Sequence, residues 1–427
     1  MTTAILFGSF IIFLILSMPI GIALGMASLV TIIFSGEVDI TYLAQSLTTS
    51  VNSFPLMAVP FFILAGELMG SGGISKRLLN VGNMLIGKYT GGLAMVTIVA
   101  CMFFAAISGS GPATVAAIGG IVVPEMIKSG YEKGFSSGLI STSGSIGVMI
   151  PPSIPMVIYG VSTGVSISTM FIAGLLPGIL VGLALILYSY ITSKKEGYKG
   201  IREEYSMKDI LKGVNEAKWA LLVPVIILGG IYGGIFTPTE AAAVAVIYGF
   251  VVGVFIYKDL KIQKVPKVVV SAAQTTATVL IIIGTATTFG RILTIEQIPT
   301  QLANAIVGVS DNRIVILLLI NILLLFVGCF METLAAVIIL APILLPVALK
   351  IGMDPVHFGI IMVVNLAIGF ITPPLGVNLF VTCGIANISI EKISKAIIPW
   401  LMVMVITLLI ITFVPAISMT LPKMFGF

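Results

Sequence analysis

Long apolar segments recur along the whole chain and are separated by short polar loops. About 20 consecutive apolar residues suffice for a helix to cross a bilayer. The pattern therefore predicts an all-α polytopic membrane protein. Its ten expected crossing helices span residues 2–17, 19–34, 52–70, 134–163, 168–193, 217–235, 239–257, 268–290, 357–386 and 396–417. The first of them lacks the basic start of a signal peptide and is expected to be retained.

Two further apolar stretches, 92–130 and 312–350, are each interrupted near the middle. The first interruption reads SGSGPATVAAIG at 108–119, and the second contains Gly328 and the sequence FMET at 330–333. We predict that each stretch forms a re-entrant helical hairpin with its tip at the interruption. The expected crossings 134–163 and 357–386 are also broken by Gly and Pro, so that four breaks lie within apolar sequence.

The composition indicates that the whole chain is a membrane domain. Of the 427 residues, 58% are hydrophobic and 9% charged, and the mean hydropathy is +1.18. The sequence contains no P-loop, HExxH or GxSxG motif, so we expect a transporter driven by an ion gradient rather than an enzyme. Cys101, Cys329 and Cys383 have no paired spacing and predict neither a disulfide framework nor a zinc site. The net charge of +5 requires no nucleic-acid partner, because loop lysines account for it.

Lysine and arginine in loops predict the orientation. With the basic linker 194–218 in the cytoplasm, 18 of the 22 basic residues fall on that side. This count requires that the two hairpins do not cross. Both termini are then expected to be periplasmic.

The two halves of the chain share landmarks at one spacing. Pro19 and Pro238 each begin a span, Thr114 and Thr333 each follow a hairpin break, and IPP at 150–152 matches TPP at 372–374. With five crossings in each half, the pattern predicts two inverted repeats, residues 1–200 and 217–427. The first repeat is expected to contain scaffold spans 2–70, hairpin 92–130, broken span 134–163 and span 168–193. The second repeat is expected to contain scaffold spans 217–290, hairpin 312–350, broken span 357–386 and span 396–417. Inverted repeats with matching broken helices indicate a secondary transporter.

Breaks at membrane depth expose carbonyl and hydroxyl oxygens, which are ligands for a small cation, and helix N-termini, which favour an anion. The alternative is that Gly, Ser and Pro only pack or kink the helices. Candidate cation ligands are Ser108, Gly109, Ser110, Ser145, Gly147, Pro151, Gly328, Met331, Glu332, Thr333, Gly369 and Thr372. Candidate substrate-binding residues are Thr114, Pro152, Ser153, Pro374 and Asn378.

Four ionisable residues lie within or next to the apolar sequence, namely Glu67, Glu240, Glu332 and His357. Glu332, at the second tip, is the carboxylate expected to be functional, either at a cation site or in proton transfer. Glu67 and Glu240 are interpreted as residues of helix ends, and Glu240 lies in a first turn, where negative charge is favoured. His357, the single histidine, is expected at the membrane interface.

Several motifs in order resemble the large membrane subunit (DctM-like or SiaM-like) of tripartite ATP-independent periplasmic (TRAP) transporters. They are FILAGELM at 62–69, SGSGPATVAAIG at 108–119, MIPPSIPMVIYG at 149–160, PTEAAA at 238–243 and FITPPLGVNLFV at 370–381. The resemblance covers essentially the whole chain and starts at the first span, as in the unfused form of that subunit.

The resemblance implies an elevator-type fold, no cofactor other than Na⁺ as coupling ion, and sodium sites at the two tips and the broken spans that face them. It also implies a separate four-helix small membrane (Q-type) subunit and a soluble periplasmic (P-type) binding protein. The substrate would be a small carboxylate such as a C4-dicarboxylate or sialic acid, and the location the bacterial cytoplasmic membrane. A stand-alone ion-coupled anion transporter and a channel stay open as alternatives.

Overall fold

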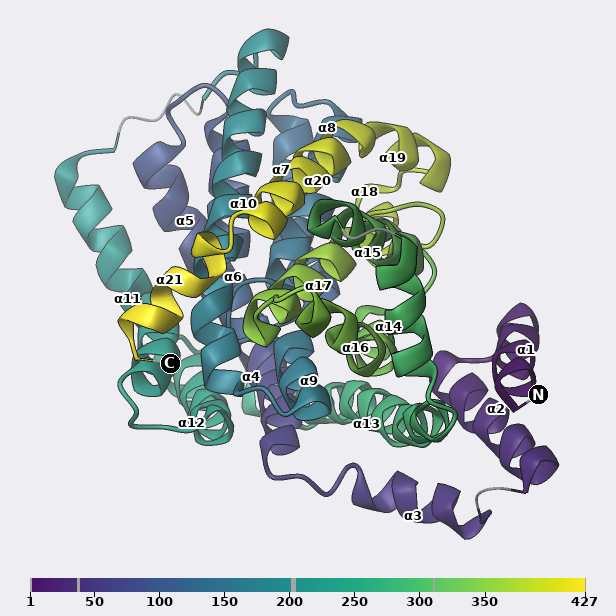
Figure 1. Ribbon diagram of the computed structural model, residues 1–427. Helices are drawn as coiled ribbons and strands as arrows, with labels where there is room; N and C mark the ends of the chain where they lie inside the picture. The colour runs from purple at the N-terminus through teal and green to yellow at the C-terminus, as the bar shows by residue number, and fades with distance from the viewer. Residues whose placement is uncertain (1, 37–38, 201–204, 310–311, 427) are drawn as a thin grey trace.

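The computed structural model describes residues 2–36, 39–200, 205–309 and 312–426, and this part of the chain is helical without strands. Arg202 of the basic linker lies outside the described residues. Figure 1 shows the helices of the first half, which are α1 (Thr2–Ile15), α2 (Ile20–Ser35), α3 (Thr41–Thr49), α4 (Ala58–Ser71), α5 (Ile74–Ile86), α6 (Gly92–Ser108), α7 (Gly111–Lys128), α8 (Lys133–Ser145), α9 (Ile154–Thr163) and α10 (Ile167–Glu196).

The second half has the helices α11 (Met207–Tyr232), α12 (Pro238–Val251), α13 (Val265–Ile295), α14 (Ile298–Val309), α15 (Arg313–Gly328), α16 (Thr333–Lys350), α17 (Pro355–Gly369), α18 (Val377–Ala386), α19 (Ile390–Ala396), α20 (Ile398–Phe413) and α21 (Ala416–Met424). Short 3₁₀ or π turns flank four of them: η1 (Pro55–Met57), η2 (Ile146–Val148), η3 (Val252–Ile256) and η4 (Ile262–Lys264). The structure therefore agrees with the predicted all-α class. It adds five short helices that the apolar pattern did not predict, namely α3, α5, α14, α19 and α21.

Fewer helices are long enough to span a membrane alone than the ten crossings predicted. In the described ranges, five helices have the length and apolarity of a span, or seven if each of two bent helix pairs counts as one. The other expected crossings are made of helices of 10–17 residues, and two of these crossings are the broken ones. One of the five long helices is α16, which was predicted as a hairpin arm. Length and apolarity therefore support five to seven spans. The larger number of ten crossings stays a prediction.

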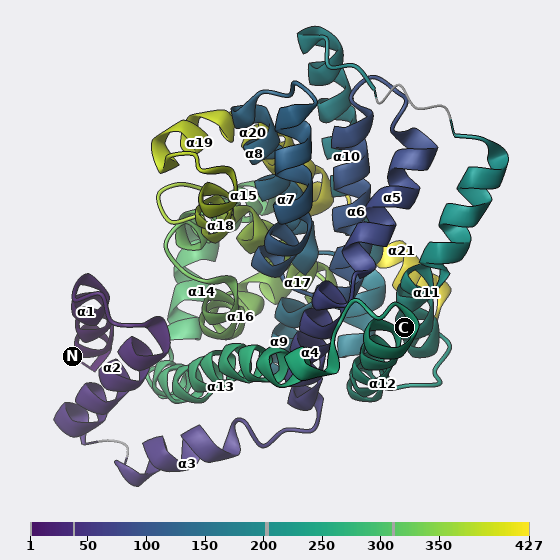
Figure 2. The same cartoon turned by 180° about the vertical axis from the view of Figure 1, so that it is seen from behind.

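The peripheral helices lie on two opposite sides of the molecule. Figures 1 and 2 show α1–α3 with the N-terminus on one side, and α5, α11 and α12 with the C-terminus on the other. The long helix α13 connects them by packing on α2 and α3 and on α4, which in turn packs on α12. The helices α2, α4, α12 and α13 form one layer of the molecule. Small residues where neighbouring helices meet allow close packing. A Cβ on Gly72 of the α4–α5 turn would come 3.0 Å from the Cα of Gly253 in η3.

The broken segments form the centre of the molecule. Every residue of α8 from Phe135 to Ser145 is buried, and so is every residue of α17 from Val356 to Gly369. The buried face of α8 includes six Ser or Thr side chains. Buried polar groups are costly unless they are paired, so hydroxyls placed here indicate a polar centre rather than a uniformly apolar core.

The expected position of His357 at the membrane interface stays a prediction, but the sequence did not predict that its side chain is buried inside the protein with 1% exposed. Its Nδ1 lies 2.6 Å from the Ser418 hydroxyl, and its Nε2 lies 3.3 Å from the Thr412 carbonyl oxygen. The start of α17 at Pro355 lies close to the start predicted for this span at residue 357. Asp354 is the N-cap of α17, and its carboxylate accepts hydrogen bonds from two backbone N–H groups. Helix α21, which no sequence signal predicted, covers His357 and thereby buries it.

Candidate functional site

The first hairpin tip is a tight connection between α6 and α7. Helix α6 ends in Gly109, which adopts a left-handed φ of 59° that favours glycine. Ser110 then caps α7, and its hydroxyl accepts a hydrogen bond from the N–H of Ala113. The Ser108 hydroxyl lies 3.0 Å from that of Thr114, which donates to the Ser110 carbonyl oxygen at 2.8 Å. Three oxygen-bearing residues are thus held together at one break.

This tip packs directly against the first broken span, between η2 and α9. A Cβ on Gly147 would come 2.5 Å from the Ser110 carbonyl oxygen and 2.6 Å from the Thr114 hydroxyl. A Cβ on Gly109 would come 2.8 Å from the carbonyl oxygen of Pro152. Only glycine permits such backbone approach. The structure therefore brings the predicted ligands of the first site together.

The residues that follow the first break are fully buried. The Ser153 hydroxyl donates to the Val148 carbonyl oxygen at 2.5 Å and accepts from the Met156 N–H at the start of α9. The peptide bond between Pro151 and Pro152 is cis, as is that between Pro373 and Pro374. Ser153 therefore uses its hydroxyl within the break itself.

The second tip meets the second broken span in the same manner. Helix α15 ends at Gly328 and α16 begins at Thr333, with Glu332 in extended conformation between them. A Cβ on Gly369 would overlap the Gly328 carbonyl oxygen. The Thr333 hydroxyl donates to the Leu366 carbonyl oxygen at 3.4 Å. Gly328, Thr333 and Gly369 thus also lie at one contact between tip and broken span.

Three of the remaining candidates occupy more open positions. The Thr372 hydroxyl donates to the Ile368 carbonyl oxygen of its own helix at 2.8 Å. Met331 is half-buried and its N–H is bonded to the Val327 carbonyl oxygen at 2.9 Å. Pro374 is exposed on the turn before α18, in contrast to the buried Pro152. The two breaks are therefore not equally enclosed.

Asn378 lies at the first site although it belongs to the second half of the chain. It is fully buried, and its Nδ2 donates to the Ser141 carbonyl oxygen at 3.0 Å and to the Ser145 hydroxyl at 3.1 Å. Its Oδ1 has no hydrogen-bond partner among the described residues and lies 3.4 Å from the position of a Cβ on Gly111. An unpaired amide oxygen next to Ser145 is a further potential cation ligand.

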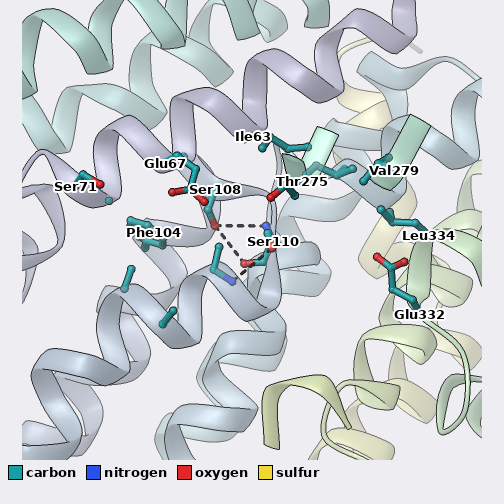
Figure 3. Close-up of a pocket in the computed structure, with 16 residues that line it drawn as sticks. Ile63, Glu67, Ser71, Phe104, Ser108, Ser110, Thr275, Val279, Glu332 and Leu334 are labelled. Carbon is teal, nitrogen blue, oxygen red and sulfur yellow. Dashed lines mark hydrogen bonds between the residues drawn. The ribbon is translucent and has the colours of Figure 1, made fainter. Parts of the chain in front are cut away.

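A cavity of about 400 Å³ is lined by residues of the two tips and of the helices α4 and α13 (Figure 3). Its polar lining comes from α4, the two tips and α13, and comprises Glu67, Ser71, Ser108, Ser110, Thr275 and Glu332. No basic side chain is found among the described residues that line it. The wall of the cavity is otherwise apolar.

Glu67 was interpreted from the sequence as a residue of a helix end, and its place in the cavity lining was not predicted. It lies in the penultimate turn of α4 and lines the same cavity as Glu332. The available signal was a lone carboxylate within an apolar helix, which the rule applied to Glu332 would also have selected. By contrast, Glu240 forms a capping box with Thr237 at the start of α12, as expected.

Within the described ranges, no three His, Cys, Asp or Glu side chains gather as a metal cluster. The oxygens that the tips offer are hydroxyl, amide and carbonyl oxygens, with the Glu332 carboxylate at the second tip, and such oxygens suit hard ions rather than transition metals.

The sequence pattern of one protein family matches residues 7–417, and that family is described as "Tripartite ATP-independent periplasmic transporter, DctM component". A 415-residue stretch, 97% of the chain, is 56% identical to the isethionate TRAP transporter permease protein DctMQ of Oleidesulfovibrio alaskensis. The chain spans 65% of the length of that relative.

Two other relatives match over nearly their full length. The C4-dicarboxylate TRAP transporter large permease protein DctM of Rhodobacter capsulatus is 41% identical, with 100% of both chains covered. The sialic acid TRAP transporter large permease protein SiaM of Vibrio cholerae is 40% identical, with 96% of this chain and 95% of the relative covered. Among solved structures, the YdaH transporter of Alcanivorax borkumensis has a similar fold, with a TM-score of 0.66 at 16% identity over 89% of this chain and 90% of that one.

Proposed function

The chain belongs to the DctM component family of tripartite ATP-independent periplasmic transporters, and we propose that it imports an organic anion by coupling to Na⁺. The observation that carries the sodium proposal is the packing of each hairpin tip against a broken span, with hydroxyl and carbonyl oxygens between them. Ser108, Ser145 and Asn378 are the proposed side-chain ligands at the first site, and Thr333 at the second. Their neutral oxygens favour a monovalent ion that must be released in every cycle.

The substrate would bind between the two sodium sites, next to the helix N-termini that follow the breaks. The cavity lining contains two carboxylates and no basic group, so an anion needs positive charge from elsewhere. Bound Na⁺ at the adjacent tips supplies that charge, which makes anion binding depend on prior sodium binding. The helix N-termini at Gly111 and Thr333 add partial positive charge. Coupling then follows from electrostatics at the site.

An elevator mechanism is proposed from the division between layer and core. Each half contributes one hairpin and one broken span to the centre, as expected of inverted repeats. The layer of α2, α4, α12 and α13 would act as the fixed scaffold. The cavity lies at the boundary between these two parts, so that movement of the centre would expose the substrate alternately to each side.

The proposed partners are a four-helix small membrane subunit and a soluble periplasmic binding protein, in the bacterial cytoplasmic membrane. The relatives are named for isethionate, C4-dicarboxylate and sialic acid, all of which are anions of organic acids. The proposed substrate class is therefore a small organic acid anion. The binding protein would make most of the choice among them.

The test is uptake of labelled organic acids into proteoliposomes that contain this chain with its small subunit. Four conditions combine an inward sodium or choline gradient with the presence or absence of the binding protein. We expect uptake only with both sodium and the binding protein. Sodium-driven uptake without the binding protein would instead support the stand-alone transporter. Non-saturating flux without a sodium gradient would support a channel.

A further inference from the structure

Helices α8 and α19 and the start of α20 lie together at one end of the molecule (Figures 1 and 2). A pocket lined by lysines lies there between the start of α8 and α19. It has a volume of about 590 Å³, and its charged lining consists of Glu132, Lys133, Lys392 and Lys395. Lys133 comes from the first half of the chain and the other two lysines from the second half. The fold thus brings together basic loops that are distant in sequence.

The positive charge of this pocket is not neutralised within the protein. Among the described residues, the ion pair found is that of Arg77 with Asp259, so none of the three lysines pairs with a carboxylate. The Lys133 ammonium donates to a neutral acceptor, the Asn387 carbonyl oxygen, at 2.7 Å. All three lysine side chains are exposed. Three clustered cations facing one Glu132 carboxylate favour an anionic ligand.

An exposed apolar stripe continues from the pocket along α20. Ile398, Met402, Ile406 and Ile410 recur every four residues on one face, and they are 53%, 60%, 56% and 44% exposed. At 1.5 Å per residue the stripe extends for about 18 Å, which is close to half of a ~30 Å hydrocarbon core. It begins three residues after Lys395. A ligand with an anionic head and apolar chains would match both surfaces.

We propose that Lys133, Lys392 and Lys395 bind the phosphate headgroup of an anionic phospholipid, with its acyl chains along the α20 stripe. Basic pockets between helices are suited to such headgroups, and each surface lysine strengthens attraction to an anionic lipid about fivefold. The lipid would link the start of α8 to α19, because it contacts lysines of both helices. This site is separate from the substrate cavity, and the proposal does not rest on the transport function.

The test is native mass spectrometry of the purified protein with defined lipids: cardiolipin, phosphatidylglycerol and phosphatidylcholine. The triple variant Lys133→Gln, Lys392→Gln, Lys395→Gln should bind the anionic lipids about 100-fold more weakly than the wild type. Binding of phosphatidylcholine should not change. A second variant, Met402→Ser with Ile406→Ser, should weaken binding of the same lipids while it leaves the lysines in place.

The matched control removes three other exposed lysines, Lys261, Lys264 and Lys267, which lie near the start of α13 and outside this pocket. It loses the same charge, and we expect its lipid binding to stay within twofold of the wild type. Equal loss in both triple variants would show only a general charge effect and overturn the proposal. Inorganic phosphate that displaces the lipid at equal concentration would indicate a site for free anions instead. Unchanged binding in the pocket variant, or protection of the stripe by another protein subunit, would also overturn it.

Discussion

At the scale of single residues, hydroxyls at the hairpin tips bond across the breaks, which supports the proposed cation sites. Ser108 and Thr114 contact each other across the first tip, and Thr333 reaches across to Leu366 of the broken span. Several other buried Ser and Thr hydroxyls bond to a carbonyl in the preceding turn of their own helix, as Thr97 does to Leu93. The tips therefore differ from the ordinary buried hydroxyls of this chain.

Ser108→Ala or Thr333→Ala should raise the sodium concentration for half-maximal uptake by about ten- to a hundredfold, because hydrogen bonds and ligands to a charged group contribute ~1.5–3 kcal/mol. The measurement is uptake at varied sodium in proteoliposomes, normalised to protein content. Thr97→Ala is the control, since its hydroxyl is equally buried but bonds within α6 at 2.8 Å. Sodium curves that coincide for tip variants and wild type would remove both residues from the site.

Asn378→Leu should lower the free energy of unfolding by about 1–3 kcal/mol, because it leaves the Ser141 carbonyl and the Ser145 hydroxyl without a buried partner. It should also reduce the rise in thermal unfolding midpoint that sodium gives the wild type, since a ligand stabilises the state to which it binds. Asn215→Leu, at an exposed position, should change neither value. Full sodium stabilisation in Asn378→Leu would show that this residue has a structural role only.

Sequence patterns located the breaks well because the signal is local. Gly, Ser and Pro within apolar sequence identified the tips at Ser108–Gly111 and Gly328–Thr333. The contact of Asn378 with Ser145 joins residues 233 positions apart and leaves no periodic trace. The burial of His357 depends in the same way on the distant α20 and α21. One-dimensional patterns could therefore place residues on breaks and helix starts, but not pair the two halves.

At the scale of elements, each hairpin is fitted to its broken span by glycines that lie backbone to backbone. Gly147 faces the first tip and Gly369 faces the second. Such contacts let carbonyl oxygens from both elements converge on one point, which a side chain at either position would prevent. The same fit explains why α8 and α17, the helices that precede the two breaks, are buried almost completely.

Gly147→Ala and Gly369→Ala should each destabilise the protein by about 1–3 kcal/mol and abolish or strongly weaken sodium activation, because the new methyl overlaps backbone oxygens that cannot rotate away. Thermal unfolding in detergent and sodium-dependent uptake measure the two effects. Gly120→Ala in α7 and Gly384→Ala in α18 serve as controls, since a Cβ at either position meets nothing within 4 Å. If the site variants behaved like these controls, the tips would not pack on the broken spans as described.

At the scale of the whole molecule, the cavity boundary runs between the layer of α2, α4, α12 and α13 and the central hairpins. Across this boundary the first tip contacts α4, where a Cβ on Gly66 would lie 3.5 Å from the Cβ of Ser108. Within the layer itself, a Cβ on Gly25 of α2 would lie 3.6 Å from that of Thr285 in α13. Both separations suit a disulfide, so the two pairs can compare motion across the boundary with motion inside the layer.

In an elevator cycle the pair Gly66→Cys with Ser108→Cys should cross-link in only part of the cycle, whereas Gly25→Cys with Thr285→Cys should cross-link at all times. We expect substrate, with sodium at a concentration raised to offset the loss of the Ser108 hydroxyl, to change the cross-linking rate of the first pair several-fold and that of the second not at all, because ligands redistribute only the states they distinguish. The rates are measured by gel shift after copper phenanthroline treatment, with Cys101, Cys329 and Cys383 replaced by Ala. A first pair that cross-links completely and without response to either ligand would show that the tips do not leave α4, and transport would then require a mechanism with a fixed boundary.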